Sequence, residues 1–140
     1  MKITRNIEDY IISKSSSINE ALKKLEESGL QILFLVDSKK RLSGVATDGD
    51  IRRWLLKQEK PDLSLEISNA SQSTYISILK GTGEHKLPNL FSRGIRYIPI
   101  LDANGLICEV ATDQYFPISI GDKKVGKDQS VYIIGEIGNN

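Results

Sequence analysis

The chain carries one stretch of sequence twice, as LEESGLQILFLVDSKKRLSGVATD at 25–48 and LFSRGIRYIPILDANGLICEVATD at 90–113. The copies align without a gap at an offset of 65 positions, and seven of the 24 pairs are identical. The identical pairs are Leu25/Leu90, Gly29/Gly94, Asp37/Asp102, Val45/Val110, Ala46/Ala111, Thr47/Thr112 and Asp48/Asp113. Five further pairs exchange one aliphatic residue for another, as expected of buried positions. The repeat predicts two similar structural units that share a core.

The first copy follows the order helix, strand, turn, strand, helix. Ser17 precedes an apolar stripe at helical spacing and Gly29 follows it, which predicts a capped helix of about three turns. The apolar runs 32–36 and 42–46 predict two strands joined by a polar hairpin turn. A further helix is expected to begin at or near Asp48.

The second copy predicts a shorter helix at 87–91 and strands at 97–101 and 106–111. Its closing helix is interrupted, because Pro117 follows Thr112 closely and proline lacks the backbone donor that a continuing helix needs. A small sheet with helices on one face buries little surface by itself. We therefore expect an α+β (α/β) fold in which the two repeats pack sheet against sheet about a pseudo-twofold axis. The cleft between them is the expected binding site.

Composition excludes several classes of function. The chain has 140 residues, of which 39% are apolar, and its 19 basic and 18 acidic side chains leave a net charge of +1. The charges are balanced, so the chain lacks the basic excess that would favour nucleic acid as a partner. The longest apolar run, 32–36, is far shorter than the roughly 20 residues that cross a bilayer, and the polar N-terminus lacks a secretory signal. These features predict a cytoplasmic protein without a membrane partner. The single cysteine, Cys108, predicts neither a disulfide nor a zinc site.

The stretch GVATDGDIR (44–52) resembles the signature of the cystathionine-β-synthase (CBS) domain. Its partial duplication resembles a CBS pair, or Bateman module, over roughly residues 5–117. We expect a first repeat at 1–66 and a second, degenerate repeat at 67–117. The resemblance implies binding of AMP, ADP or ATP, with S-adenosylmethionine ranked behind them, and regulation of an attached enzyme. It also implies a homodimer.

The motif Thr47-x-x-Asp50 has two readings. Alone it is an ordinary helix capping box. A helix N-terminus also attracts phosphate, and the resemblance implies that Thr47 contacts phosphate or ribose while Asp50 accepts the ribose hydroxyls. It further implies that adenine packs against the start of a strand in the opposite repeat. Arg52 and Arg53 could reach phosphates or simply keep an exposed helix face solvated. The predicted nucleotide-binding residues are Val45, Thr47, Asp50, Arg52, Arg53, Arg96, Tyr97, Ile98 and Pro99.

The second site departs from this pattern. Tyr115 stands where the ribose carboxylate is expected, and Glu109 replaces the glycine equivalent to Gly44. A tyrosine offers one hydroxyl where a carboxylate accepts two charge-assisted bonds. A carboxylate at position 109 would also repel a phosphate if it faced the cleft. The second site is therefore expected to be weak or empty.

Residues 118–140 do not continue the repeat. VYIIGEIGNN (131–140) resembles the first barrel strand of the sialic-acid synthase family, which condenses phosphoenolpyruvate with a hexosamine sugar. The resemblance implies that Glu136 lies near the active site of a truncated barrel, so that only a longer protein would be an N-acetylneuraminate synthase-like transferase. The 140 residues contain no recognisable catalytic set or metal site. The competing hypothesis is a purely structural or dimerising module tethered to the synthase.

Overall fold

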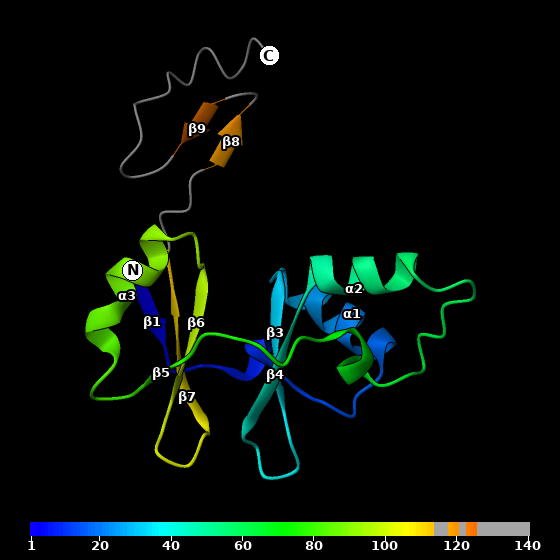
Figure 1. Ribbon diagram of the computed structural model, residues 1–140, viewed down its shortest axis with the longest axis horizontal. Coiled ribbons are helices and arrows are strands. Elements are labelled where there is room, and N and C mark those ends of the chain that lie inside the picture. The colour runs from blue at the N-terminus through cyan, green and yellow to red at the C-terminus, as the bar shows by residue number, and fades with distance from the viewer. Residues whose placement is uncertain (114–117, 121–122, 126–140) are drawn as a thin grey trace.

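The computed structural model describes residues 1–113, 118–120 and 123–125 of the chain. Figure 1 shows two lobes side by side, each with strands toward the middle of the molecule and helices on the outside. The first lobe holds a three-stranded sheet in the order β2 (Ile11–Ser13), β3 (Ile32–Val36) and β4 (Leu42–Thr47). The second holds a four-stranded sheet in the order β1 (Lys2–Thr4), β7 (Ile107–Thr112), β6 (Tyr97–Leu101) and β5 (Ile78–Leu79).

Both helices of the first lobe begin where the sequence predicts, and α1 also ends there. α1 (Ile18–Ser28) starts at a capping box between Ser17 and Glu20. It ends at Gly29, whose left-handed φ of 71° favours glycine. α2 (Asp48–Leu56) starts at a second capping box, between Thr47 and Asp50. The hairpin β3–β4 is antiparallel, as expected.

The second lobe repeats this hairpin as β6–β7, which follows α3 (Leu87–Ser92). The sequence predicted these three elements but not the short strands β1, β2 and β5. The predicted interrupted helix after Thr112, with Tyr115 and Pro117, lies outside the described residues, as does Glu136. β8 (Ile118–Ile120) pairs antiparallel with β9 (Lys123–Val125).

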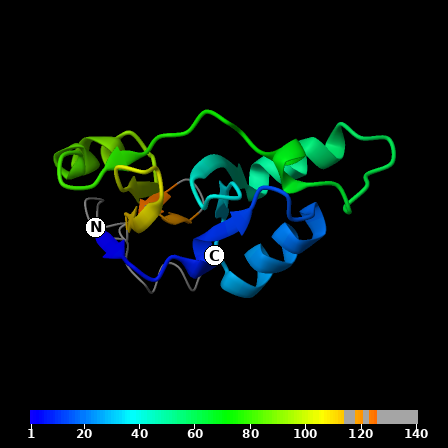
Figure 2. The same ribbon diagram turned by 90° about the horizontal axis from the view of Figure 1, so that it is seen from below.

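The lobes exchange edge segments. The N-terminal strand β1 pairs with β7 of the second lobe, although it precedes the first repeat. Conversely η2 (Ile67–Ala70), which follows the first repeat, places its two buried apolar residues in the core of the first lobe. Figure 2 shows the N-terminal segment crossing between the lobes on one side and the segment after η2 crossing on the other. Each lobe therefore contains a segment from the other side of the boundary expected at residue 66, and that boundary stays a prediction.

Within the described part of the chain, the core has three parts. One apolar cluster lies between α1, α2 and the first sheet, and another lies between α3 and the second sheet. The third joins the sheets, since Phe34, Val36 and Leu42 of the first lobe pack with Ile107 and Val110 of the second. This third cluster confirms the expected packing of sheet against sheet.

Equivalent hydrogen bonds mark the relation between the repeats. The Asp48 N–H donates to the Gln31 carbonyl at 3.1 Å, and the Asp113 N–H donates to the Arg96 carbonyl at 3.2 Å. The two donors, Asp48 and Asp113, are 65 positions apart, and so are the two acceptors, Gln31 and Arg96. At the hairpin tips, the Leu42 N–H donates to the Gly105 carbonyl at 3.0 Å. None of the helices among the described residues is both long and apolar enough to cross a membrane.

Candidate functional site

A cavity of about 410 Å³ lies where the two repeats meet. Its walls come from the start of β3, the start of β6 and the N-terminus of α2. The lining residues are Gln31, Ile32, Thr47, Asp48, Gly49, Arg52, Ile95, Arg96 and Tyr97. Gln31 and Ile32 stand exactly one repeat offset before Arg96 and Tyr97, so the cavity sits between equivalent strand starts of the two repeats. The predicted cleft between repeats is therefore present.

The N-terminus of α2 forms one wall of this cavity. Thr47 Oγ1 accepts the Asp50 N–H at 3.0 Å, and Asp50 Oδ2 accepts the Thr47 N–H at 2.9 Å. This reciprocal pair fixes the first turn of the helix. Gly49 brings its backbone to the wall without a side chain. The positive end of the helix dipole lies at the cavity, which favours an anionic group there.

The Asp50 carboxylate does not line the cavity. Its side chain is only 5% exposed and accepts three hydrogen bonds. Besides the Thr47 N–H, the donors are Arg53 Nη2 at 2.7 Å and Gln72 Nε2 at 2.5 Å, both to Oδ1. Burial raises the pKa of Asp50, but the hydrogen bonds from Thr47, Arg53 and Gln72 outweigh it and hold the pKa below its ordinary value. Asp50 is therefore a carboxylate at neutral pH.

Two arginines and one aspartate supply the charge of the cavity wall. Arg52 Nη2 lies 2.7 Å from Asp48 Oδ2, and both side chains are largely exposed. Arg96 stands on the opposite wall, at the start of β6. The charged lining thus has a cationic excess, which suits a phosphate. Arg53 is not a lining residue. Its guanidinium lies close to Gly49 and donates a hydrogen bond to Asp50.

Four of the nine predicted binding residues line the cavity, namely Thr47, Arg52, Arg96 and Tyr97. Val45 packs against the cluster between the sheets, while Ile98 and Pro99 are fully buried. The nucleotide-binding roles given to these residues stay predictions.

Sequence reasoning missed five lining residues, which are Gln31, Ile32, Asp48, Gly49 and Ile95. The repeat itself contained a signal for two of them. The expected contact of adenine with positions 96 and 97 has its counterpart at 31 and 32 once the offset of 65 is applied. Gln72 was also missed, because no local pattern marks a side chain that reaches Asp50 from a segment 22 residues away.

The second copy of the site is organised differently. Glu109 is 7% exposed, and its Oε1 lies 3.2 Å from both Arg5 Nε and Lys80 Nζ. These two cations come from the N-terminal segment and from the residue after β5. The carboxylate is therefore engaged in ion pairs within the second lobe. Tyr115, the other predicted departure from the pattern, lies outside the described residues.

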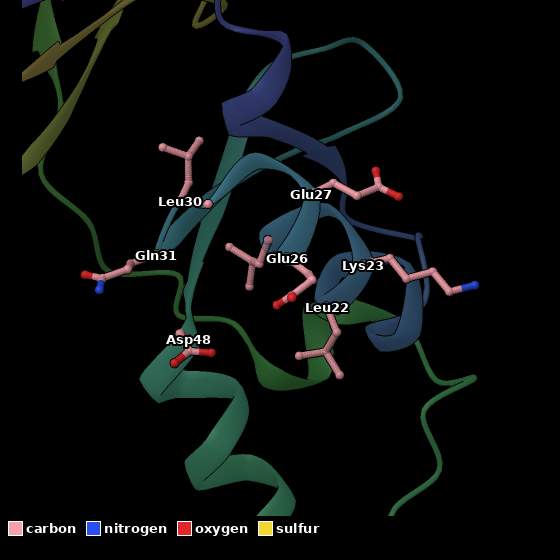
Figure 3. A pocket seen from close by; sticks show the side chains of 9 residues that line it. Leu22, Lys23, Glu26, Glu27, Leu30, Gln31 and Asp48 are labelled. Carbon is pink, nitrogen blue, oxygen red and sulfur yellow. The ribbon is translucent and has the colours of Figure 1, made fainter.

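A larger cavity, of about 620 Å³, shares Gln31 and Asp48 of its lining with the one of about 410 Å³. Figure 3 shows residues from the C-terminal half of α1, the loop after it and the start of α2 around this space. Glu26, Glu27 and Asp48 outnumber Lys23 among its charged lining residues. This acidic excess disfavours a phosphate, so the smaller cavity is the better candidate for a nucleotide. No cluster of three metal-ligating side chains was found in the described part of the chain.

Residues 4–57 match the family model described as "CBS domain". Among solved structures, CBSX2 in complex with AMP has a TM-score of 0.64 and 20% identity, covering 79% of this chain and 85% of that one. The CBS domain protein PAE2072 from Pyrobaculum aerophilum, complexed with AMP, has a TM-score of 0.60 and 21% identity, covering 73% and 78%. These similarities show that the chain has the fold of CBS domain pairs.

Curated relatives are longer than the matched region. Arabinose 5-phosphate isomerase GutQ of Shigella flexneri is 27% identical over 94 residues, which are 67% of this chain and 29% of that protein. An uncharacterized protein of Helicobacter pylori is 32% identical over 98 residues, which are 70% of this chain and 27% of that protein. The chain thus spans less than a third of the length of these relatives.

Proposed function

We propose, from the CBS domain at residues 4–57 and the CBS pair fold of the whole, that the chain binds an adenine nucleotide between its repeats and regulates an attached enzyme. One observation carries the proposal: the cavity of about 410 Å³ combines a helix N-terminus, two arginines and an aromatic ring. Two neighbours of the same fold are described in complex with AMP, which supports the same class of ligand here.

Each part of a nucleotide has a suitable counterpart in this cavity. The N-terminus of α2, with Arg52 and Arg96, suits the phosphates. Ile32, Ile95 and Tyr97 offer the apolar and aromatic surface that an adenine ring needs. Asp50 follows the lining residue Gly49 in the sequence. It would accept the ribose hydroxyls once a present donor has left it, as an acidic residue does in other nucleotide sites.

The proposed output is a change in how the module sits against the protein domain that follows it. The start of β6 lines the cavity, and the Arg96 carbonyl accepts the N–H of Asp113 at the exit of β7. A ligand contacting Arg96 therefore acts close to the connection with the downstream chain. Regulation requires that the ligand favour one arrangement over another. We propose a sialic-acid (nonulosonic acid) synthase barrel as the regulated domain, on the resemblance of residues 131–140.

Calorimetric titration of the 140-residue chain with AMP, ADP, ATP and S-adenosylmethionine tests the binding proposal. We expect at least one adenine nucleotide to bind, and Asp50→Ala to weaken that binding by about 1.5–3 kcal/mol, the usual worth of hydrogen bonds to a charged group. Asp9→Ala, at an exposed acidic residue outside the cavity lining, is the control. No heat of binding at millimolar ligand would remove the proposal.

A purely structural module, which joins or dimerises synthase chains, is the alternative. The hydrogen bonds of Asp50 favour it, because the carboxylate already accepts three of them from within the chain. Thermal melts distinguish the two functions. A ligand that binds only the folded chain raises the melting midpoint as its concentration rises, whereas a structural module melts at the same temperature with every nucleotide.

A further inference from the structure

Gln72 links the proposed ribose carboxylate to the segment that joins the two repeats. Its backbone forms a two-bond bridge to β4, with the Val45 N–H donating to the Gln72 carbonyl at 2.9 Å and the Gln72 N–H donating to the Val45 carbonyl at 2.8 Å. Its side-chain amide donates to Asp50 Oδ1 at 2.5 Å. The backbone of Gln72 is therefore fixed on the first lobe while its amide is directed at Asp50.

The hydrogen-bonding capacity of Asp50 limits what else it can hold. A carboxylate has about four lone-pair positions. Thr47, Arg53 and Gln72 already donate to three of them. The two adjacent hydroxyls of a ribose need two positions, so at least one present donor must leave before both hydroxyls can bind.

The three donors differ in how easily they can leave. The Thr47 N–H belongs to the backbone and is held by the capping box of α2. Arg53 is itself a cation, so its bond to Asp50 is also an ion pair between opposite charges. Gln72 is a neutral donor on an exposed residue, and its amide can turn into water without breaking the backbone bridge to Val45.

We propose that the Gln72 amide occupies the place of a ribose hydroxyl on Asp50 and competes with ribose-containing ligands for it. This inference rests on the proposed function and concerns the selectivity of the same site. Gln72 is then a determinant of affinity for the sugar diol, since a ligand that places both hydroxyls on Asp50 must displace one donor, whereas a ligand without them need displace none. When such a ligand binds, the amide is released on the segment between the repeats, while the carboxylate stays fully satisfied.

The test is a comparison of two ligands and two side chains, read by calorimetry on the full chain. AMP carries both ribose hydroxyls, and 2′,3′-dideoxy-AMP carries neither. We expect Gln72→Ala to tighten AMP binding about ten- to a hundred-fold, the range of one hydrogen bond to a charged group, and to leave the dideoxy analogue unchanged. Gln72→Met repeats the test with a side chain of similar length that cannot donate. Gln58→Ala, at another exposed glutamine, is the matched control.

Each outcome bears on a different part of the proposal. Unchanged or weaker AMP binding in both Gln72 variants overturns the competition. Equal tightening of AMP and the dideoxy analogue also overturns it, because the gain would not pass through the hydroxyls. The comparison uses whichever adenine nucleotide the wild-type chain binds, with its dideoxy analogue. If none binds, the proposed function fails and takes this inference with it. Wild-type binding with unaltered variants, in contrast, removes only the role of Gln72.

Discussion

Glu109 holds in the second repeat the position that Gly44 holds in the first, 65 residues earlier, and the two positions are used in opposite ways. The backbone at Gln72 approaches Gly44 so closely that a Cβ atom at position 44 would lie 3.0 Å from the Gln72 carbonyl oxygen. At Glu109 the side chain instead reaches the cations of Arg5 and Lys80. The same strand position thus packs against backbone in one lobe and forms ion pairs in the other.

Gly44→Ala is expected to destabilise the chain by about 1–3 kcal/mol, the usual cost of overpacking. The contact is with backbone, and that backbone is held by the bridge between Gln72 and Val45, so it cannot move aside cheaply. Urea denaturation followed by circular dichroism measures the effect. An unchanged midpoint would mean that the backbone at Gln72 does not lie in close contact with β4.

Gly49→Ala is the matched control for that substitution. A Cβ atom at position 49 would lie 3.2 Å from Arg53 Nη1, the far end of a flexible side chain that can shift. Alanine is also the better helix former, by up to about 1 kcal/mol. We therefore expect Gly49→Ala to leave stability unchanged or slightly raised, in contrast to Gly44→Ala.

The stoichiometry of binding follows from the difference between positions 44 and 109. Because a carboxylate stands at 109 and takes up Arg5 and Lys80, we expect one AMP per chain in calorimetry. Glu109→Gln, which removes the charge but keeps the size, is expected to leave the affinity at the first site unchanged. Two equivalent sites in the wild-type chain would contradict this expectation.

The repeat made most of the fold predictable. Helices α1 and α2 and the hairpins β3–β4 and β6–β7 carry strong local signals, such as the capping box at Ser17 and apolar runs bounded by polar turns. The strands β1, β2 and β5 have two or three residues each, too few for a periodic pattern. They form because partner strands far along the chain offer free edges, which is information that no local window contains.

The site was predictable only in its general location. The doubled motif indicated a cleft with Thr47 on one wall and positions 96 and 97 on the other, and these residues do line one cavity. The direction of the Asp50 carboxylate was not predictable, because it depends on Gln72 from a distant segment and on Arg53 one turn along α2. Spacing places a residue on an element, whereas the donors available nearby decide where its side chain turns.

Asp50 should also make stability depend on pH in the acid range. Its folded-state pKa lies below the unfolded value of about 3.9, so the carboxylate contributes stability above that pH and loses it as the pH falls through the folded value. We expect Asp50→Asn to be less stable than the wild type at pH 7 by about 1–3 kcal/mol. The difference should shrink below about pH 4.

Melting temperatures of both proteins from pH 7 down to pH 3 measure this difference. Asp37, Asp62 and Glu84 also have lowered pKa values, chiefly through hydrogen bonds from Arg41, Ser64 and Gly81 respectively, so both proteins lose some stability in acid. Only the difference between the two curves reports Asp50. A difference that stays constant with pH would show that the carboxylate charge is not what the variant removes.

Tyr10 contacts one aromatic ring from each lobe. Its ring stacks on Phe34 of the first lobe, with centroids 6.3 Å apart, and meets Tyr97 of the second at 6.1 Å. Because Tyr97 lines the cavity, Tyr10→Ala should lower stability by about 2–3 kcal/mol and weaken AMP binding several-fold through loss of support for that ring.

Tyr10→Phe separates the ring from the hydroxyl. It keeps both ring contacts, so stability in urea and AMP affinity by calorimetry should stay close to wild type. If Tyr10→Ala loses stability but binds AMP as before, the position of Tyr97 does not depend on the N-terminal segment, and the ring contact serves only to hold the lobes together. Loss of both properties in Tyr10→Ala alone would show that the segment entering the first repeat shapes the wall contributed by the second.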